Sequence, residues 1–218
     1  MDDNADQPTS SMPATRGYQQ EMLEESLHNN IIIALDTGSG KTHIAVLRLK
    51  HEMERESTKV CHHSPLPDNG PLTFFFLLQL SWFFAPTVAL CDQQKHVIAE
   101  HIPVSVGIVS GANEPNQWRN AALWDRVLQT HRIMVSTPQV FLDALRHGYI
   151  SLGRHISLLV FDEAHHAVDN HPYNRIMVEF YFDLPRRDHS QSPMEVRPMV
   201  LGLTASPIYG GNVVKAFR

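Results

Sequence analysis

The stretch LDTGSGKT at residues 35–42 contains residue types that suit phosphate chemistry. Gly38 and Gly40 allow the backbone to fold around an anion, so that successive N–H groups point at a phosphate. Lys41 would neutralise charge on the β- and γ-phosphates of a nucleotide, and the Thr42 hydroxyl would ligate Mg²⁺. The stretch matches the end of the phosphate-loop pattern G-x-x-x-x-G-K-[ST], with leucine where the pattern has its first glycine. We therefore predict that a nucleotide contacts Leu35, Asp36, Thr37, Gly38, Ser39, Gly40, Lys41 and Thr42.

The segments on either side decide between a phosphate site and an ordinary glycine-serine turn. Residues 31–35 form a short apolar run rich in β-branched residues, which predicts a strand covered on both faces. Residues 41–57 have helical periodicity, and we interpret the charge run at 50–56 as an exposed helix end. Strand, loop and helix in this order are the context that the phosphate-loop pattern requires.

Two adjacent carboxylates stand where another apolar run ends, in LLVFDEAHH at residues 158–166. By themselves, Asp162 and Glu163 could belong to a solvated loop. Beside a phosphate loop, Asp162 would hold Mg²⁺, usually through water, and Glu163 would orient or activate the attacking water. His165 would couple this site to its neighbour, whereas His166 would face solvent or pack. We thus predict Lys41, Asp162 and Glu163 as catalytic residues, with Thr42 and Asp162 as Mg²⁺ ligands.

Short apolar runs alternate with polar or helical segments along the rest of the chain. The runs are residues 82–85, 104–109, 132–137, 158–163 and 199–206. This alternation predicts βα units, and hence an α/β fold with a mostly parallel sheet, helices on both faces and the chemistry at the carboxyl ends of the strands. We expect one such domain over residues 15–218, after a disordered tail at 1–14.

Composition excludes some classes of protein. The net charge of −5 indicates no broad polyanion-binding surface, so any nucleic-acid contact must be local. The two cysteines, Cys61 and Cys91, argue against a disulfide scaffold. The first residues are acidic and polar, where a secretory signal would be basic and then apolar. We expect an intracellular protein of the cytoplasm or nucleus.

The most apolar stretch, residues 72–90, does not predict a membrane span. A spanning helix needs roughly 20 mostly apolar residues. This stretch is interrupted by Gln79, Ser81, Pro86 and Thr87. Just before it, CHH at residues 61–63 offers three adjacent metal ligands without further spaced partners, which makes a poor tetrahedral site.

Three motifs in this order resemble motifs I, II and III of superfamily 2 nucleic-acid helicases: LDTGSGKT, DEAH and LGLTASP. The resemblance implies a RecA-like lobe with ATP and Mg²⁺ as cofactors. Gln19, in RGYQQ, would contact the edge of the adenine base. Thr204 and Ser206 resemble the motif III pair that links the acidic site to the binding of a nucleic-acid strand. The turns APT and STP resemble motifs Ia and Ib, although a loop that starts a helix is the alternative reading for each. The implied nucleic-acid contacts are Pro86, Thr87, Thr137 and Pro138.

From Arg16 onward, the chain resembles the amino-terminal helicase region of Dicer-like ribonucleases, in particular the second type of fungal Dicer-like protein. The resemblance is carried by YQQEMLEESLHNNIIIALDTGSGKTHIA, WFFAPTVALCDQQ, VFDEAHH and VLGLTASP. It implies double-stranded RNA as the partner, ATP as the fuel, and a role in RNA silencing and antiviral defence.

The sequence stops soon after the third motif, so we expect a piece of such a protein, without the second RecA-like lobe and the ribonuclease domains. A second lobe supplies arginines that stabilise the transferring phosphate, and an arginine finger is worth about 10³ to 10⁵ in rate. This lobe alone should bind ATP weakly and hydrolyse it hardly at all. The alternatives are a DNA-directed translocase lobe of the same superfamily and a non-catalytic nucleotide-binding remnant or pseudogene product.

Residues 60–79 separate the charged helix from the next strand, whereas these two elements should be almost contiguous in such a protein. We hypothesise that this segment is a retained intron, because its residues can be encoded by the usual splice signals. Val60–Cys61 allows the donor GTATGT, Leu72–Thr73 the branch point CTAAC, Phe74–Phe76 a thymine tract and Gln79 the acceptor CAG. The 20 codons would preserve the reading frame.

The mature transcript should therefore lack the codons for residues 60–79 and join Lys59 to Leu80. Sequencing of reverse-transcribed RNA across Lys59 to Ser81, beside the genomic sequence, measures this directly. A transcript that keeps these codons, or a genomic sequence without the four signals, would contradict the hypothesis.

Overall fold

The computed structural model describes residues 14–62, 79–109, 120–186 and 195–205. Its centre is a six-stranded sheet in the order β1-β6-β5-β2-β4-β3, in which every neighbouring pair of strands is parallel. The strands are β1 (Ile31–Ala34), β2 (Leu80–Phe84), β3 (Val106–Val109), β4 (Ile133–Ser136), β5 (Ile156–Phe161) and β6 (Met199–Thr204). Each strand overlaps an apolar run of the sequence, and the predicted parallel α/β fold is confirmed.

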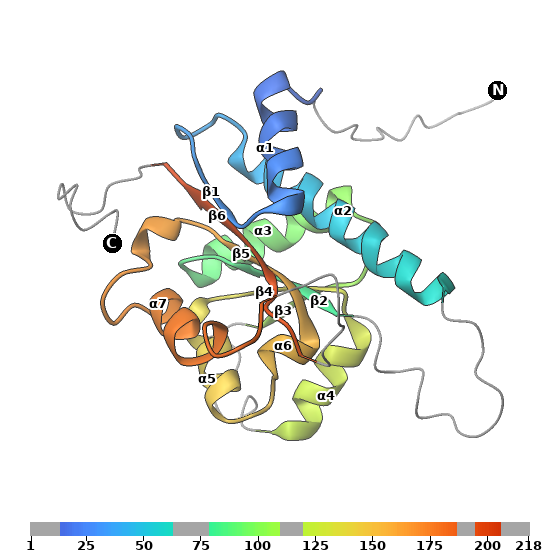
Figure 1. Cartoon of the computed structure of the whole chain (residues 1–218), viewed down its shortest axis with the longest axis vertical. Coiled ribbons are helices and arrows are strands. Elements are labelled where there is room, and N and C mark those ends of the chain that lie inside the picture. Colours follow the sequence, from blue (N-terminus) through green and yellow to red (C-terminus); the bar gives the residue numbers. More distant parts are fainter. Residues whose placement is uncertain (1–13, 63–78, 110–119, 187–194, 206–218) are drawn as a thin grey trace, which may run out of the picture.

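Helices precede or connect the strands along the chain and cover both faces of the sheet. They are α1 (Gly17–His28), α2 (Lys41–His62), α3 (Val88–His101), α4 (Ala121–Thr130), α5 (Pro138–Arg146), α6 (Leu152–His155) and α7 (Pro172–Ile176). A 3₁₀ turn η3 (Ala164–His166) and a π-helical turn η4 (Met177–Tyr181) complete the set. Figure 1 shows α1, α2 and α3 on one side of the sheet and α4, α5 and α7 on the other.

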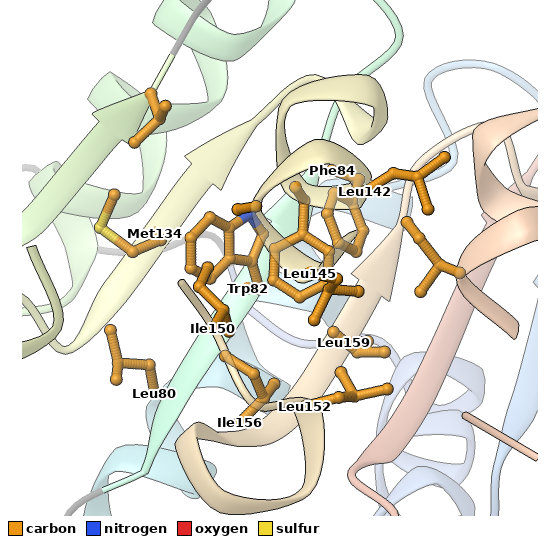
Figure 2. Close-up of a cluster of buried hydrophobic side chains, with 14 of the residues drawn as sticks. Leu80, Trp82, Phe84, Met134, Leu142, Leu145, Ile150, Leu152, Ile156 and Leu159 are labelled. Atoms are coloured by element: carbon orange, nitrogen blue, oxygen red, sulfur yellow. The ribbon is translucent and has the colours of Figure 1, made fainter. Parts of the chain in front are cut away.

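Strand β2 shows why the central strands read as continuous apolar runs. Successive side chains of a strand point to opposite faces. Trp82 and Phe84 therefore join the core beneath α4, α5 and α7 (Figure 2), whereas Phe83 joins the core beneath α2 and α3. All five residues of β2 are buried, because both faces of this strand are covered.

The Trp82 indole is one of two buried indoles in the first of these cores, the other being that of Trp124. Its ring centroid lies 4.6 Å from that of Phe141, on α5. Its N–H donates a 2.8 Å hydrogen bond to Ser136 Oγ on the neighbouring strand β4. A buried N–H without a partner would cost about 1–3 kcal/mol, so this serine makes the burial of the indole possible.

Strand β1 differs from the sequence prediction. We expected a strand covered on both faces, but Ile32 is 69% exposed and Ala34 is exposed as well. The reason is its position, because β1 forms an edge of the sheet and pairs with β6 alone among the described residues. Ile33, on the opposite face, is buried in the core with α2.

The charge run of α2 is only in part the exposed helix end that we predicted, because Lys50 and Glu54 are exposed but other charges of this half of the helix are buried. Arg48, Glu52 and Glu56 have side chains at most 2% exposed. Arg48 donates to Glu52 Oε2 at 2.8 Å and to the Ser26 carbonyl oxygen of α1 at 3.2 Å. Arg55 pairs with both glutamates. Ion pairs within the protein therefore satisfy the buried charges Arg48, Glu52 and Glu56.

Gln79 connects this ion network to the first residue of β2. Its backbone N–H donates to Glu56 Oε2 at 3.3 Å, and its carbonyl oxygen accepts from Arg132 Nη2 at 2.9 Å. Its side-chain amide donates to the Gly153 carbonyl oxygen at 3.1 Å. Most of the hypothesised intron, residues 63–78, lies outside the described residues. No helix within the described ranges is both long and apolar enough to cross a membrane.

Glu52 should make the stability of the fold depend on acidic pH. Burial raises the pKa of the Glu52 carboxyl, but hydrogen bonds and the charges of Arg55 and Arg48 outweigh burial and lower the pKa from 4.5 to about 2. Because the folded pKa is depressed, the stabilisation is complete above about pH 4.5 and is lost as the pH falls toward 2. A shift of this size corresponds to roughly 3 kcal/mol.

Glu52→Gln should therefore lower the free energy of unfolding at pH 7 by about 3–5 kcal/mol, because it leaves Arg48 buried without its counter-charge. Urea unfolding at several pH values measures this. The variant should also show a flatter dependence on acidic pH than the control Glu54→Gln, whose side chain is exposed on the same helix. Equal stabilities and parallel pH curves for the two variants would contradict the ion network.

Candidate nucleotide-binding site

The phosphate loop connects the end of β1 to the start of α2 by a tight turn. Gly38 has φ +82° and Gly40 has φ +91°, in the left-handed region that favours glycine. The Ser39 N–H donates to the Asp36 carbonyl oxygen at 3.2 Å, which closes the turn. Helix α2 begins at Lys41, so the positive end of its dipole faces the loop.

Helix α1 is bonded directly to this loop. The Tyr18 hydroxyl and the Gln19 side-chain amide donate to the same Ser39 carbonyl oxygen, at 2.7 and 3.2 Å. Gln19 Oε1 accepts from the Arg16 N–H at 2.9 Å, and the Gln19 side chain is buried. Gln19 thus lies against the base of the loop. Its predicted contact with adenine stays a prediction.

The Lys41 ammonium group is held at the mouth of the loop. Its Nζ donates to the carbonyl oxygens of Leu35 and Asp36, at 2.7 and 3.2 Å. These bonds keep the positive charge beside the turn that the two glycines form. To bind the β- and γ-phosphates as predicted, Lys41 would exchange neutral carbonyl partners for charged ones, which make stronger hydrogen bonds.

The order of strands brings the three motifs to one edge of the sheet. Leu35 follows β1, and its N–H donates to the Thr204 carbonyl oxygen at the end of β6, at 3.0 Å. Strand β6 also pairs with β5, which ends immediately before Asp162. Lys41 and Asp162 lie close enough for the charge of Lys41 to lower the pKa of the Asp162 carboxyl.

The acidic end of β5 is a sharp bend with two neighbouring carboxylates. Glu163 adopts a left-handed conformation, with φ 52° and ψ 49°, and its N–H donates to Asp162 Oδ1 at 3.0 Å. Burial and the nearby charge of Glu163 raise the pKa of the Asp162 carboxyl, against the opposing effects of the Glu163 N–H and Lys41. A cation placed here would offset both the cost of burying the charged carboxylate and the repulsion between the two carboxylates.

The residues present fit Mg²⁺ bound mainly through a nucleotide. No group of three His, Cys, Asp or Glu side chains within the described ranges could hold a metal ion by itself. Mg²⁺ normally keeps several waters and is held by one or two carboxylates plus substrate phosphates. Asp162, with its raised pKa, and the half-buried Thr42 hydroxyl offer the hard oxygen ligands that such an ion needs.

His165 connects the acidic bend to β6. Its Nδ1 lies 2.8 Å from Thr204 Oγ1 and 3.2 Å from Glu163 Oε2. Burial and the neighbouring His166 lower the pKa of His165, so its ring is neutral at neutral pH. The structure thus brings together His165 and Thr204, two of the residues predicted to couple this site to the binding of a nucleic-acid strand. The third, Ser206, lies outside the described residues. The His166 ring packs against that of His165 at 4.2 Å.

The two predicted nucleic-acid turns follow β2 and β4 at the same edge of the sheet. Thr87 is exposed and begins α3, and its hydroxyl accepts from the Leu90 N–H at 3.3 Å. Thr137 precedes α5 and is half-buried, whereas Pro138 is buried at the first helical position. Both turns therefore start helices. Their contact with nucleic acid stays a prediction.

A profile of the DEAD/DEAH box helicase family matches residues 16–209, which includes nearly all of the described fold. The chain belongs to this family. Membership indicates an ATP-binding role of the superfamily 2 helicase type for this region, in agreement with the loop and the acidic bend. DEAD/DEAH box helicases are in general ATP hydrolases that use Mg²⁺.

Relatives of this helicase region are much longer proteins. The chain is 43% identical over 199 residues to Dicer-like protein 2 of Cryphonectria parasitica, and 46% identical over 193 residues to Dicer-like protein 2 of Coccidioides immitis. These matches cover 91% and 88% of this chain but only 12% of each relative. The helicase domain of Pyrococcus furiosus Hef superposes with a TM-score of 0.65 and 28% identity, over 93% of this chain and 35% of that one.

Gly40→Ala should detach the loop from α1 and weaken nucleotide binding. A Cβ at this position would lie 2.3 Å from Gln19 Nε2, and the positive φ already disfavours alanine. Because strained backbone costs about 1–3 kcal/mol, we expect the affinity for a fluorescent ATP analogue to fall by about tenfold or more.

Gly148→Ala is the matched control. Gly148 also has a positive φ, +71°, but an added Cβ would meet no atom within 4 Å. This variant should bind the analogue like the wild type, at some cost in melting temperature. If both variants bind equally well, Gly40 does not have the role assigned to it.

Proposed function

We propose that this chain is the ATP-binding lobe of a double-stranded-RNA-dependent ATPase of the Dicer-like type, which acts in RNA silencing and antiviral defence. The observation that supports this most is the meeting of the phosphate loop, the acidic bend and Thr204 at one sheet edge, in a DEAD/DEAH box helicase region more than 40% identical to Dicer-like protein 2 relatives. We further propose that residues 15–218 form one such lobe.

In this proposal, the chain itself supplies five functions. N–H groups of the loop and Lys41 bind the phosphates, and Gln19 contacts the adenine. Asp162 and Thr42 would hold Mg²⁺, which neutralises charge that develops on the phosphates. Glu163 orients the attacking water. The neutral His165 contacts both Glu163 and Thr204, and so couples the position of this carboxylate to the end of β6.

Hydrolysis at a useful rate would depend on a second RecA-like lobe. We propose that the relatives carry it in their additional length, since this chain spans about 12% of them. Thr87 and Thr137 would contact the RNA backbone from turns that follow β2 and β4. Such contacts are independent of sequence and weaken with salt, so duplex geometry and 2′-hydroxyl groups would select RNA.

Lys41→Ala should abolish Mg²⁺-dependent binding of a fluorescent ATP analogue to this chain. Lys50→Ala on the same helix, with an exposed side chain, should leave it unchanged. Fused to the second lobe of a Dicer-like protein 2 relative, the chain should show ATP hydrolysis that increases with double-stranded RNA. Stimulation by duplex DNA instead would favour a DNA-directed translocase. Nucleotide binding without hydrolysis in the fusion would indicate a non-catalytic nucleotide-binding remnant, and no nucleotide binding at all would indicate a pseudogene product.

A further inference from the structure

Tyr173 lies on α7, outside every motif discussed above, and packs against the acidic bend. Its side chain is 1% exposed. The ring meets those of Phe161 and His171 at steep angles, with centroids 4.8 Å apart in both pairs, and the Phe84 ring lies 5.9 Å away. A phenylalanine would fill this site equally well, so the buried hydroxyl requires its own explanation.

The partners of that hydroxyl are backbone oxygens at the ends of two strands. It donates to the Asp162 carbonyl oxygen at 2.8 Å and lies 3.5 Å from that of Phe84. Burial, and then the charge of Asp162, raise the pKa of the Tyr173 hydroxyl far above its ordinary value. Because these partners are carbonyl oxygens, the hydroxyl acts here as the donor.

The Asp162 carbonyl belongs to the bend that determines where the two carboxylates point. The pairing of β5 with β6 ends at Phe161, and Glu163 then takes its left-handed conformation. Such a conformation costs about 1–3 kcal/mol and persists only where the surroundings hold it. Tyr173 fixes the residue before this conformation, and the His166 N–H bonds to the Glu163 carbonyl oxygen after it, at 3.0 Å.

We propose that the Tyr173 hydroxyl is a positioning group that holds the backbone of Asp162 and thereby sets the affinity of the site for Mg²⁺-bound nucleotide. The inference rests on the proposed function, because it takes Asp162 to approach the Mg²⁺ of bound ATP. Tyr173 does not itself contact the nucleotide. It acts through Asp162, so its removal should affect binding that involves Mg²⁺ and spare the contacts of the phosphate loop.

Tyr173→Phe removes the hydroxyl and keeps the ring. The dissociation constant of a fluorescent ATP analogue is measured for this chain, with excess Mg²⁺ and again with EDTA. With Mg²⁺, we expect the variant to bind about three- to tenfold more weakly than the wild type, the effect of one lost hydrogen bond. With EDTA, the two should bind equally.

Tyr181→Phe is the matched control. Tyr181 is also buried, and its hydroxyl donates to the Pro198 carbonyl oxygen at 3.2 Å and accepts from Asn30 Nδ2 at 2.7 Å. We expect both variants to have a lower melting temperature than the wild type. The control should nevertheless keep the wild-type ratio between the affinities measured with Mg²⁺ and with EDTA. In an Asp162→Asn background, Tyr173→Phe should no longer change the Mg²⁺-dependent affinity.

Three results would overturn the inference: a wild-type ratio in Tyr173→Phe, an equal loss of affinity with Mg²⁺ and EDTA, or a variant that does not fold, since the hydroxyl would then serve the fold rather than the site. The proposed function fails in a different way, because then the wild-type chain itself would show no Mg²⁺-dependent binding of the analogue.

Discussion

Parallel strands all end at the same edge of a sheet, and the candidate site depends on this constraint. The loop after β1, the bend after β5 and Thr204 at the end of β6 come from segments far apart in the sequence, yet the order β1-β6-β5 makes them neighbours. Backbone and side-chain hydrogen bonds then join them through Thr204, whose carbonyl oxygen bonds Leu35 and whose hydroxyl bonds His165.

The interior of the protein keeps this edge in place. The central strand β2 is buried on both faces, and Trp82 ties it to β4 through Ser136. The buried charges of α2 continue this connection, because Gln79, the residue before β2, bonds both to Glu56 of α2 and to Arg132, the residue before β4. Stability and the geometry of the site are therefore coupled through the same strands.

Much of this fold could be predicted from sequence, because its signals are local. Apolar runs predicted the positions of all six strands, and the glycines before Lys41 predicted the tight turn between β1 and α2. Two interpretations were wrong, the second of them in part, because they concern burial, which long-range packing determines. The cover of Ile32 depends on which strand forms the edge. Arg48 and Arg55 meet Glu52 within α2 itself, but the burial of Glu52 depends on how α2 packs against the rest of the protein. Tyr173 had no motif to reveal it, since its role comes from a contact between α7 and β5.

The most direct test of the account is a crystal structure of this chain with Mg²⁺ and a non-hydrolysable ATP analogue. The account predicts phosphates on the N–H groups of residues 36–42, Lys41 Nζ on the β- and γ-phosphates, and Mg²⁺ beside Thr42 and Asp162. A nucleotide bound elsewhere, or phosphates on the loop with Mg²⁺ remote from Asp162, would contradict the assignment of this sheet edge as the ATP site.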